Sequence, residues 1–254
     1  MEPTQFRLEN NSLYNYIKNQ VLPIRFSEHI SNESLEYDSS IGGYITNSLM
    51  QPSPTSRGRG WVYFDDAIVN GTTVVNVGAE QSSKVSVVGA SSYDIDYVNG
   101  AIKNPDTTPT SVSYYWNYVS VMMGWPGTTP PSLPLVSILV DYSEKSGFQL
   151  GPGVKNTRSV SFHVFATSPE ERDDLLESIH DSIHDKTINI LDFSDGDYLN
   201  YDGTFNTDLS LPLVAISSLY FISTTSRIIY VEDSWTDLNM YRGVVNGTYE
   251  SLVY

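Results

Sequence analysis

Two histidines four residues apart, His180 and His184, form the first pattern in the chain that could do chemistry. Residues at this spacing share one face of a helix, where two imidazoles can bind one divalent metal. Glu177 and Asp181 lie on the same face, but a zinc site needs a third or fourth convergent ligand, and the His-Glu-x-x-His order of zinc proteases is missing. We interpret these residues as the solvated face of a helix and predict no metal site.

A run of aspartates offers a second candidate, a calcium site, because hard cations prefer clustered carboxylate and carbonyl oxygens. The order of an EF-hand fails, since Gly196 stands one place early and the twelfth position falls on Gly203. We therefore expect a solvated turn. The aspartates concerned are Asp192, Asp195, Asp197 and Asp202.

Enzyme signatures are missing from the sequence. None of the 4 histidines accompanies a Gly-x-Ser-x-Gly motif, and no glycine loop stands where the strand ending at Ala166 meets the following helix. A glycoside hydrolase needs two carboxylates facing across a cleft, and this acidic chain offers too many pairs for the sequence to select one. We predict no catalytic residue, no cofactor and no enzymatic activity, with an acidic hydrolase as an open alternative.

The chain has 254 residues, of which 40% are hydrophobic, enough to bury a core. It carries 14 Lys and Arg against 30 Asp and Glu, for a formal net charge of -16, and its one basic cluster is Arg57-Gly58-Arg59. Such a surface repels nucleic acid and would suit a conduit that DNA must cross without sticking. Cysteine is absent, which excludes disulfides and thiolate metal sites.

The N-terminal residues and the apolar runs bear on localisation. M-E-P-T-Q-F-R-L has no basic region followed by an apolar run, so we expect no signal peptide. No apolar run approaches the roughly 20 residues that span a bilayer. We expect a soluble protein made in a cytoplasm.

The strongest folding pattern runs from Thr157 to Phe193. Its first ten residues alternate in hydrophobicity as a half-buried strand does, and Ser168-Pro169-Glu170-Glu171 then supplies a capping box with proline at the first helical position. A return to strand character over T-I-N-I-L-D-F completes a β-α-β unit. The predicted helix carries an apolar stripe of Leu175, Leu176, Ile179 and Ile183.

The segments before this unit differ in texture. Helical spacing predicts a short amphipathic helix over Ser12 to Phe26, ending near Pro23. The polar stretch from Ser27 to Ser56 is either an extended arm that faces a partner or a loop held on its own molecule. Short β-branched and aromatic runs from Trp61 to Met123 predict a small antiparallel β module. Hairpin turns are expected at Asn70-Gly71 and Asn99-Gly100, and an inter-module joint at Gly124 to Pro131.

The remaining chain completes the expected sheet. Leu133 to Tyr142 reads as a buried strand, and two further strands are expected after the acidic loop, over L-P-L-V-A-I-S-S-L-Y-F-I-S-T and R-I-I-Y-V-E-D. Ser234 to Tyr254 has little period and is expected to be an extension that binds a neighbour.

The expected fold class is α+β: a mixed or antiparallel sheet packed by one or two helices, with an inserted antiparallel β module. The expected domains are an N-terminal helix and extended arm over residues 1–56, the inserted module over 57–130, and an α+β core with a C-terminal extension over 131–254.

This order of elements resembles the bacteriophage tail-terminator and neck protein group. The resemblance is carried by the N-terminal helix, the strand ending H-V-F-A-T-S, the helix S-P-E-E-R-D-D-L-L-E-S-I and the strand T-I-N-I-L-D-F, and it covers the first helix and Leu133 to Val231. It implies a small α+β domain that forms a ring, commonly a hexamer, capping the tail tube and joining it to the head-side connector. The family acts by ring geometry and surface complementarity, so no site residue is carried over.

The resulting hypothesis is a virion structural protein of the phage head-to-tail junction, made in the host cytoplasm. Its partners would be copies of itself in a homo-oligomeric ring, the adjacent connector, and tail tube or sheath proteins. DNA would pass through the acidic lumen without specific binding, and no membrane is involved. The insertion leaves terminator, neck, collar and stopper roles open. Besides the hydrolase, the alternative is a β-rich glycan-binding module that uses exposed aromatic residues such as Trp116.

Overall fold

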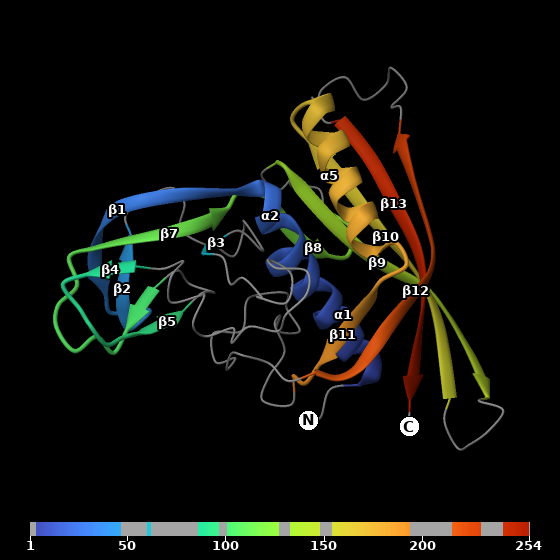
Figure 1. Cartoon of the computed structure of the whole chain (residues 1–254), viewed down its shortest axis with the longest axis horizontal. Helices are drawn as coiled ribbons and strands as arrows, with labels where there is room; N and C mark the ends of the chain where they lie inside the picture. The colour runs from blue at the N-terminus through green and yellow to red at the C-terminus, as the bar shows by residue number, and fades with distance from the viewer. Residues whose placement is uncertain are drawn as a thin grey trace. The chain divides into compact units, whose positions relative to one another are not determined.

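The computed structural model describes residues 4–46, 60–61, 86–96, 101–126, 133–147, 154–193, 215–229 and 241–253 (Figure 1). The chain divides into two compact units. We call residues 1–17, 120–198 and 209–254 the core unit, and residues 18–119 with 199–208 the inserted unit. The insertion therefore begins after residue 17 and ends at 119, whereas the sequence suggested a module over 57–130.

The core unit is built on a six-stranded sheet with the order β11-β12-β13-β10-β9-β8. β8 and β9 are parallel and the other neighbours are antiparallel, so the sheet is mixed and the expected α+β class is confirmed. The strands are β8 Ser120–Met123, β9 Leu135–Gly147, β10 Val154–Ala166, β11 Thr187–Leu191, β12 Ala215–Ile229 and β13 Tyr241–Val253.

Two helices, α1 Gln5–Tyr16 and α5 Pro169–Ile183, cover one face of this sheet (Figure 1). The alternation predicted for β10 is confirmed, since Val160, Phe162 and Val164 are buried on the helix side. The predicted apolar stripe of α5 is also confirmed, with all four of its residues buried. Burial of four such side chains contributes on the order of 6–12 kcal/mol before entropy is counted.

The start of α5 shows the predicted cap in a modified form. Ser168 Oγ accepts a hydrogen bond from the Glu171 backbone N–H at 3.1 Å, as a capping box requires. The Glu171 carboxylate, however, accepts from the backbone N–H of Thr167 at 2.8 Å and from its hydroxyl at 2.7 Å. The glutamate thus reaches one residue further back and fixes the last residue before the cap.

The β-α-β order holds along the chain, but β10 and β11 are not neighbours, because β13 and β12 lie between them. Over the described residues 215–229, the two strands expected after the acidic loop are one long strand, β12, with an irregularity between Phe221 and Ser223. A bulge of this kind breaks the alternation without ending the strand.

The expected C-terminal extension is wrong for residues 241–253, which form β13 at the centre of the sheet. Its helix-facing positions include Gly243 and Gly247, where an added Cβ would lie 2.5 Å from Leu176 Cδ1 and 2.6 Å from Phe221 Cε1. Glycine is needed there so that larger side chains of other elements can cross the strand. The same glycines erase the apolar alternation that would have revealed a strand.

The inserted unit contains an antiparallel sheet with the order β3-β7-β1-β2-β6-β5, and β4 also pairs with β7. Its buried cluster is Ile102, Val112 and Tyr114. The strands are β1 Ser27–Asp38, β2 Gly43–Thr46, β3 Gly60–Trp61, β4 Ser86–Val88, β5 Asp94–Asp96, β6 Ala101–Lys103 and β7 Ser111–Asn117.

Residues 27–46 are therefore neither a free arm nor a loop but two strands of this sheet. The few apolar residues of this polar stretch, among them Ile30, Leu35 and Tyr44, pack against the buried cluster. A sheet with one covered face needs only such sparse apolar positions.

Over the described residues 60–61, 86–96 and 101–117, the antiparallel module predicted from Trp61 onward is confirmed, while residues 62–85 and 97–100 lie outside the described residues. β8, which was expected to belong to this module, instead joins the core sheet in parallel with β9. Both predicted Asn-Gly turns lie outside the described residues, as do residues 47–56, although β5 and β6 flank the second turn and pair antiparallel.

The N-terminal helix begins earlier than predicted, at Gln5, with Thr4 as its cap. It continues as a π-helical segment, Ile17–Val21, and then as α2 Leu22–Phe26, so the chain stays helical past Pro23. The early turns were missed because one of their buried residues is the carboxylate Glu9, which no apolar pattern reveals. None of the described helices is both long and apolar enough to span a membrane.

Candidate functional site

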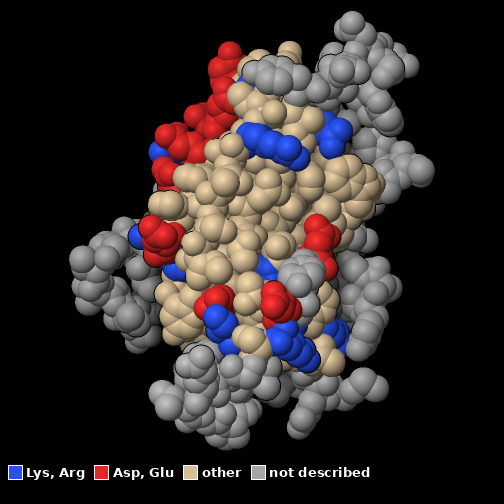
Figure 2. Space-filling model, turned by 90° about the vertical axis from the view of Figure 1, so that its right-hand side faces the viewer, with Lys and Arg blue, Asp and Glu red and all other residues tan. Residues whose placement is uncertain are grey.

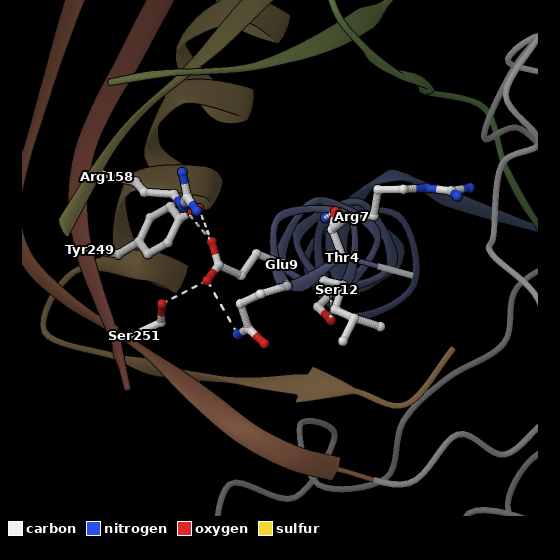
Figure 3. Close-up of polar contacts among 9 residues, drawn as sticks. Thr4, Arg7, Glu9, Ser12, Arg158, Tyr249 and Ser251 are labelled. Carbon is white, nitrogen blue, oxygen red and sulfur yellow. Dashed lines mark hydrogen bonds and ion pairs between the residues drawn. The ribbon is translucent and has the colours of Figure 1, made fainter. Parts of the chain in front are cut away.

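A buried carboxylate is the most concentrated polar feature of the core unit (Figure 3). Glu9 of α1 is 0% exposed and accepts a hydrogen bond from Arg158 Nε of β10, with 2.6 Å between Nε and Oε2. From β13, Tyr249 Oη donates to Oε2 at 3.2 Å and Ser251 Oγ donates to Oε1 at 2.6 Å. Gln5 Nε2 adds a contact of 3.3 Å to Oε1. Both carboxylate oxygens are therefore satisfied.

The surroundings of this cluster favour a structural role. The Arg158 guanidinium lies over the Phe6 ring, 4.7 Å from its centroid. Burial raises the pKa of Tyr249 far above its ordinary value, and the negative charge of Glu9 raises it further. The phenol stays protonated and acts as a donor. Because Glu9 is fully buried, we interpret the cluster as a structural contact that holds α1 against the sheet. The sequence gives no signal for it, since Glu9 and Arg158 are 149 residues apart.

The predicted histidine pair does lie on α5 and just after it. The rings of His180 and His184 stack with centroids 5.4 Å apart. His184 Nδ1 lies 2.7 Å from Thr224 Oγ1, and His180 Nδ1 lies 3.4 Å from Asp181 Oδ1. Within the described ranges, no group of three or more His, Cys, Asp or Glu side chains is placed to hold a metal. The pair thus contacts its own neighbours on the helix and on β12.

For most of the other candidate residues from the sequence, the side chain lies outside what the structure describes. Asp192 is described, but Asp195, Asp197 and Asp202 lie outside the described residues, as does the basic cluster at 57–59. Trp116 belongs to β7, without a description of its side chain.

The face of the core sheet opposite the helices, which we call the open face, is the broadest candidate for function. Its central strands present small polar residues that are partly exposed, and Figure 2 shows a broad surface without charged residues between basic and acidic groups. On β12, Ile216 is 51% exposed and Tyr220 is 47% exposed. The partly exposed polar residues of β10 and β13 are Ser159, Ser161, Asn246 and Thr248.

An aromatic and cationic group lies on this face of the core unit. Trp125 is 52% exposed, and His163 meets it edge-on with ring centroids 4.9 Å apart. The Arg242 guanidinium lies 5.5 Å from the Trp125 ring centroid and 5.0 Å from that of Phe165. Burial lowers the pKa of His163, and the charge of Arg242 lowers it further, so the imidazole is neutral at pH 7. Arg242 therefore lies against the Trp125 ring, while about half of the tryptophan surface remains exposed.

The open face combines exposed apolar and aromatic side chains with hydroxyls, amides and the cation of Arg242, a composition found at protein–protein interfaces. A comparison with protein-family models and with curated protein sequences finds no match for the chain.

Proposed function

We propose that this protein is a structural, non-enzymatic component of the phage head-to-tail junction, a tail terminator or neck protein that forms a ring. The observation that carries the proposal is the core unit itself. It has the element order on which the resemblance rests: an N-terminal helix, a strand, a capped helix and a strand. In this chain the inserted unit interrupts that order between α1 and β8.

The open face supports the ring. A sheet covered by helices on one side and exposing Ile216, Tyr220 and Trp125 on the other leaves apolar area that an assembly would bury. In a ring, one surface of each copy binds a different surface of the next copy. When the rotation from copy to copy adds up to a full turn, this repeated contact closes into a ring.

The charge of the chain supports a lumen that DNA crosses. A formal net charge of -16 gives each copy a negative field that repels the phosphate backbone. Adding copies around an axis multiplies this charge. The proposal therefore has DNA passing through the ring without a specific binding site.

The test is the mass of the full chain in solution, with negative-stain microscopy of the same sample, alone and mixed with phage tail tubes. Rings alone or on the tube ends are the expected result. A chain that stays monomeric even when tubes are present would contradict the proposal. Binding of a polysaccharide by such a monomer would favour the glycan-binding alternative, and cleavage of it would favour the hydrolase.

A matched pair of variants tests the open face. Ile216→Asp places a charge on this face, and Val88→Asp places the same charge at a strand position of the inserted unit that is also 51% exposed. We expect the first variant to lose rings and the second to keep them. Equal loss in both would indicate that added charge, and not the open face, controls assembly.

A further inference from the structure

One patch of the open face combines aromatic surface with a cation, and we call its residues Trp125, His163, Phe165 and Arg242 the arginine patch. The Arg242 guanidinium lies against the rings of Trp125 and Phe165, and Trp125 is 52% exposed. Tryptophan and arginine are among the residue types that most often dominate the binding energy of a protein interface. The arginine patch is therefore the part of the open face best suited to anchor a partner.

Arg242 is available to an acidic group of that partner. Within the described part of the chain, it contacts aromatic rings, and no carboxylate pairs with it. An arginine that lies against aromatic rings keeps its N–H donors, which can bind both oxygens of a carboxylate.

The groups that act on His163 show the charge of the surroundings. Burial lowers the pKa of His163, and the charge of Arg242 lowers it further. Asp141 of β9 raises this pKa and Arg227 of β12 lowers it, both less strongly than Arg242. Arg227 is exposed but also borders a groove beside α5, so Arg242 is the main cation of the arginine patch.

The outer face of α5 is the surface of this chain that complements the arginine patch in charge. Its acidic residues are Glu170, Glu171, Asp173, Asp174, Glu177 and Asp181. Glu171, Asp173, Glu177 and Asp181 each have a contact within the chain. Glu170 and Asp174 are exposed and lie one turn apart on the same side of the helix. They are the acids of α5 best placed to meet a cation from outside.

The position of α5 allows a contact between copies. It covers the face of the sheet opposite to the open face, so the two surfaces point to different sides of the core unit (Figure 1). A contact between them joins copies head to tail, as a ring requires.

Charge also favours this contact over one between other surfaces. Copies that each carry a formal net charge of -16 repel one another. With 14 basic residues against 30 acidic ones, a contact that offsets the repulsion has to bring a cation of one copy to acids of the next.

We propose that the arginine patch binds the outer face of α5 in a second copy of the chain, with Arg242 of one copy paired to Glu170 and Asp174 of the next. This inference rests on the proposed ring and names the two surfaces that meet in it.

Two variants with opposite charge changes test the contact. Arg242→Glu places acid against acid, and the double variant Glu170→Lys with Asp174→Lys places base against base. Each sample by itself should need at least about ten-fold more protein to form rings, as followed by sedimentation velocity and negative-stain microscopy, alone and with tail tubes. An equimolar mixture of the two should assemble again, because each altered surface then meets the opposite charge on the other chain.

The control for net charge is Lys186→Glu, which changes the charge of the chain by the same amount at an exposed position outside α5 and the arginine patch. It should form rings within about two-fold of the concentration that the unchanged chain needs. Arg242→Gln guards against misfolding, since it removes the charge but keeps a polar side chain, and it should weaken assembly as well. Hydrogen exchange at the amides of β10 and β13 checks that each variant is folded.

Two results would overturn the contact and leave the ring standing, provided that the unchanged chain forms rings. One is assembly of Arg242→Glu at the same concentration as Lys186→Glu. The other is a mixture of the two opposite variants that stays as dispersed as its components, because the acids of α5 would then not be the partner of Arg242. An unchanged chain that forms no rings, alone or with tail tubes, contradicts both proposals.

Discussion

Removing the charge of Glu9 should destabilise the core unit far more than removing a surface charge. Glu9→Gln keeps the size of the side chain but leaves Arg158, which is 8% exposed, without its counter-charge. Breaking a buried pair in this way costs about 3–5 kcal/mol. For a chain of this size that corresponds to a Tm lower by about 10 °C.

The matched control is Glu250→Gln. It breaks an ion pair between β10 and β13, the two strands that supply Arg158, Tyr249 and Ser251 to Glu9. Lys155 Nζ lies 2.8 Å from Glu250 Oε1, but the two side chains are 35% and 27% exposed. A partly solvated pair contributes less than about 1 kcal/mol. Because the chain has two compact units, unfolding is best followed by hydrogen exchange at the amides of β10 and β13 and not by one global transition.

The double variant Glu9→Gln with Arg158→Met completes the test. With no unpaired buried charge, and with a thioether beside the Phe6 ring, it should be more stable than Glu9→Gln alone. If Glu250→Gln proves as damaging as Glu9→Gln, or if the double variant recovers nothing, the cluster is not a buried ion pair that ties α1 to the sheet.

Three further predictions concern packing, capping and pH. Gly243→Ala should cost about 1–3 kcal/mol in chemical denaturation because its Cβ would meet Leu176, and the cost should shrink in a Leu176→Ala background; additive costs would contradict this contact. Ser168→Ala should cost about 1 kcal/mol while Ser168→Asp, which keeps a capping oxygen, costs less, and equal losses in thermal unfolding would argue against the cap. Burial raises the pKa of Tyr16 to about 12 from an ordinary value of 10.0, so the folded chain holds this proton more tightly than the unfolded chain. Its contribution is fully present below pH 10 and falls by about 1.4 kcal/mol per pH unit between pH 10 and 12. Because Tyr249 also has a raised pKa, urea titrations of Tyr16→Phe should show a slope that is shallower by about this amount and not a flat line.

The sequence by itself determined the local units of the core. The alternation of β10, the cap at Ser168 and the apolar stripe of α5 depend on residues close together in the chain, so their spacing is enough to predict them. The α+β class followed from the same patterns. The acidic charge is likewise a property of composition alone.

Tertiary structure decided what long-range packing controls. β13 is a strand because Leu176 and Phe221, from other elements, fill the space above its glycines, so its own sequence shows no alternation. Residues 27–38 form a strand because β7 pairs with it from Ser111 to Asn117, far along the chain, and residues 43–46 form a strand between β1 and β6. Glu9 is buried because Arg158, Tyr249 and Ser251 satisfy its carboxylate. None of these depends on spacing along the chain, because each arises where distant segments meet.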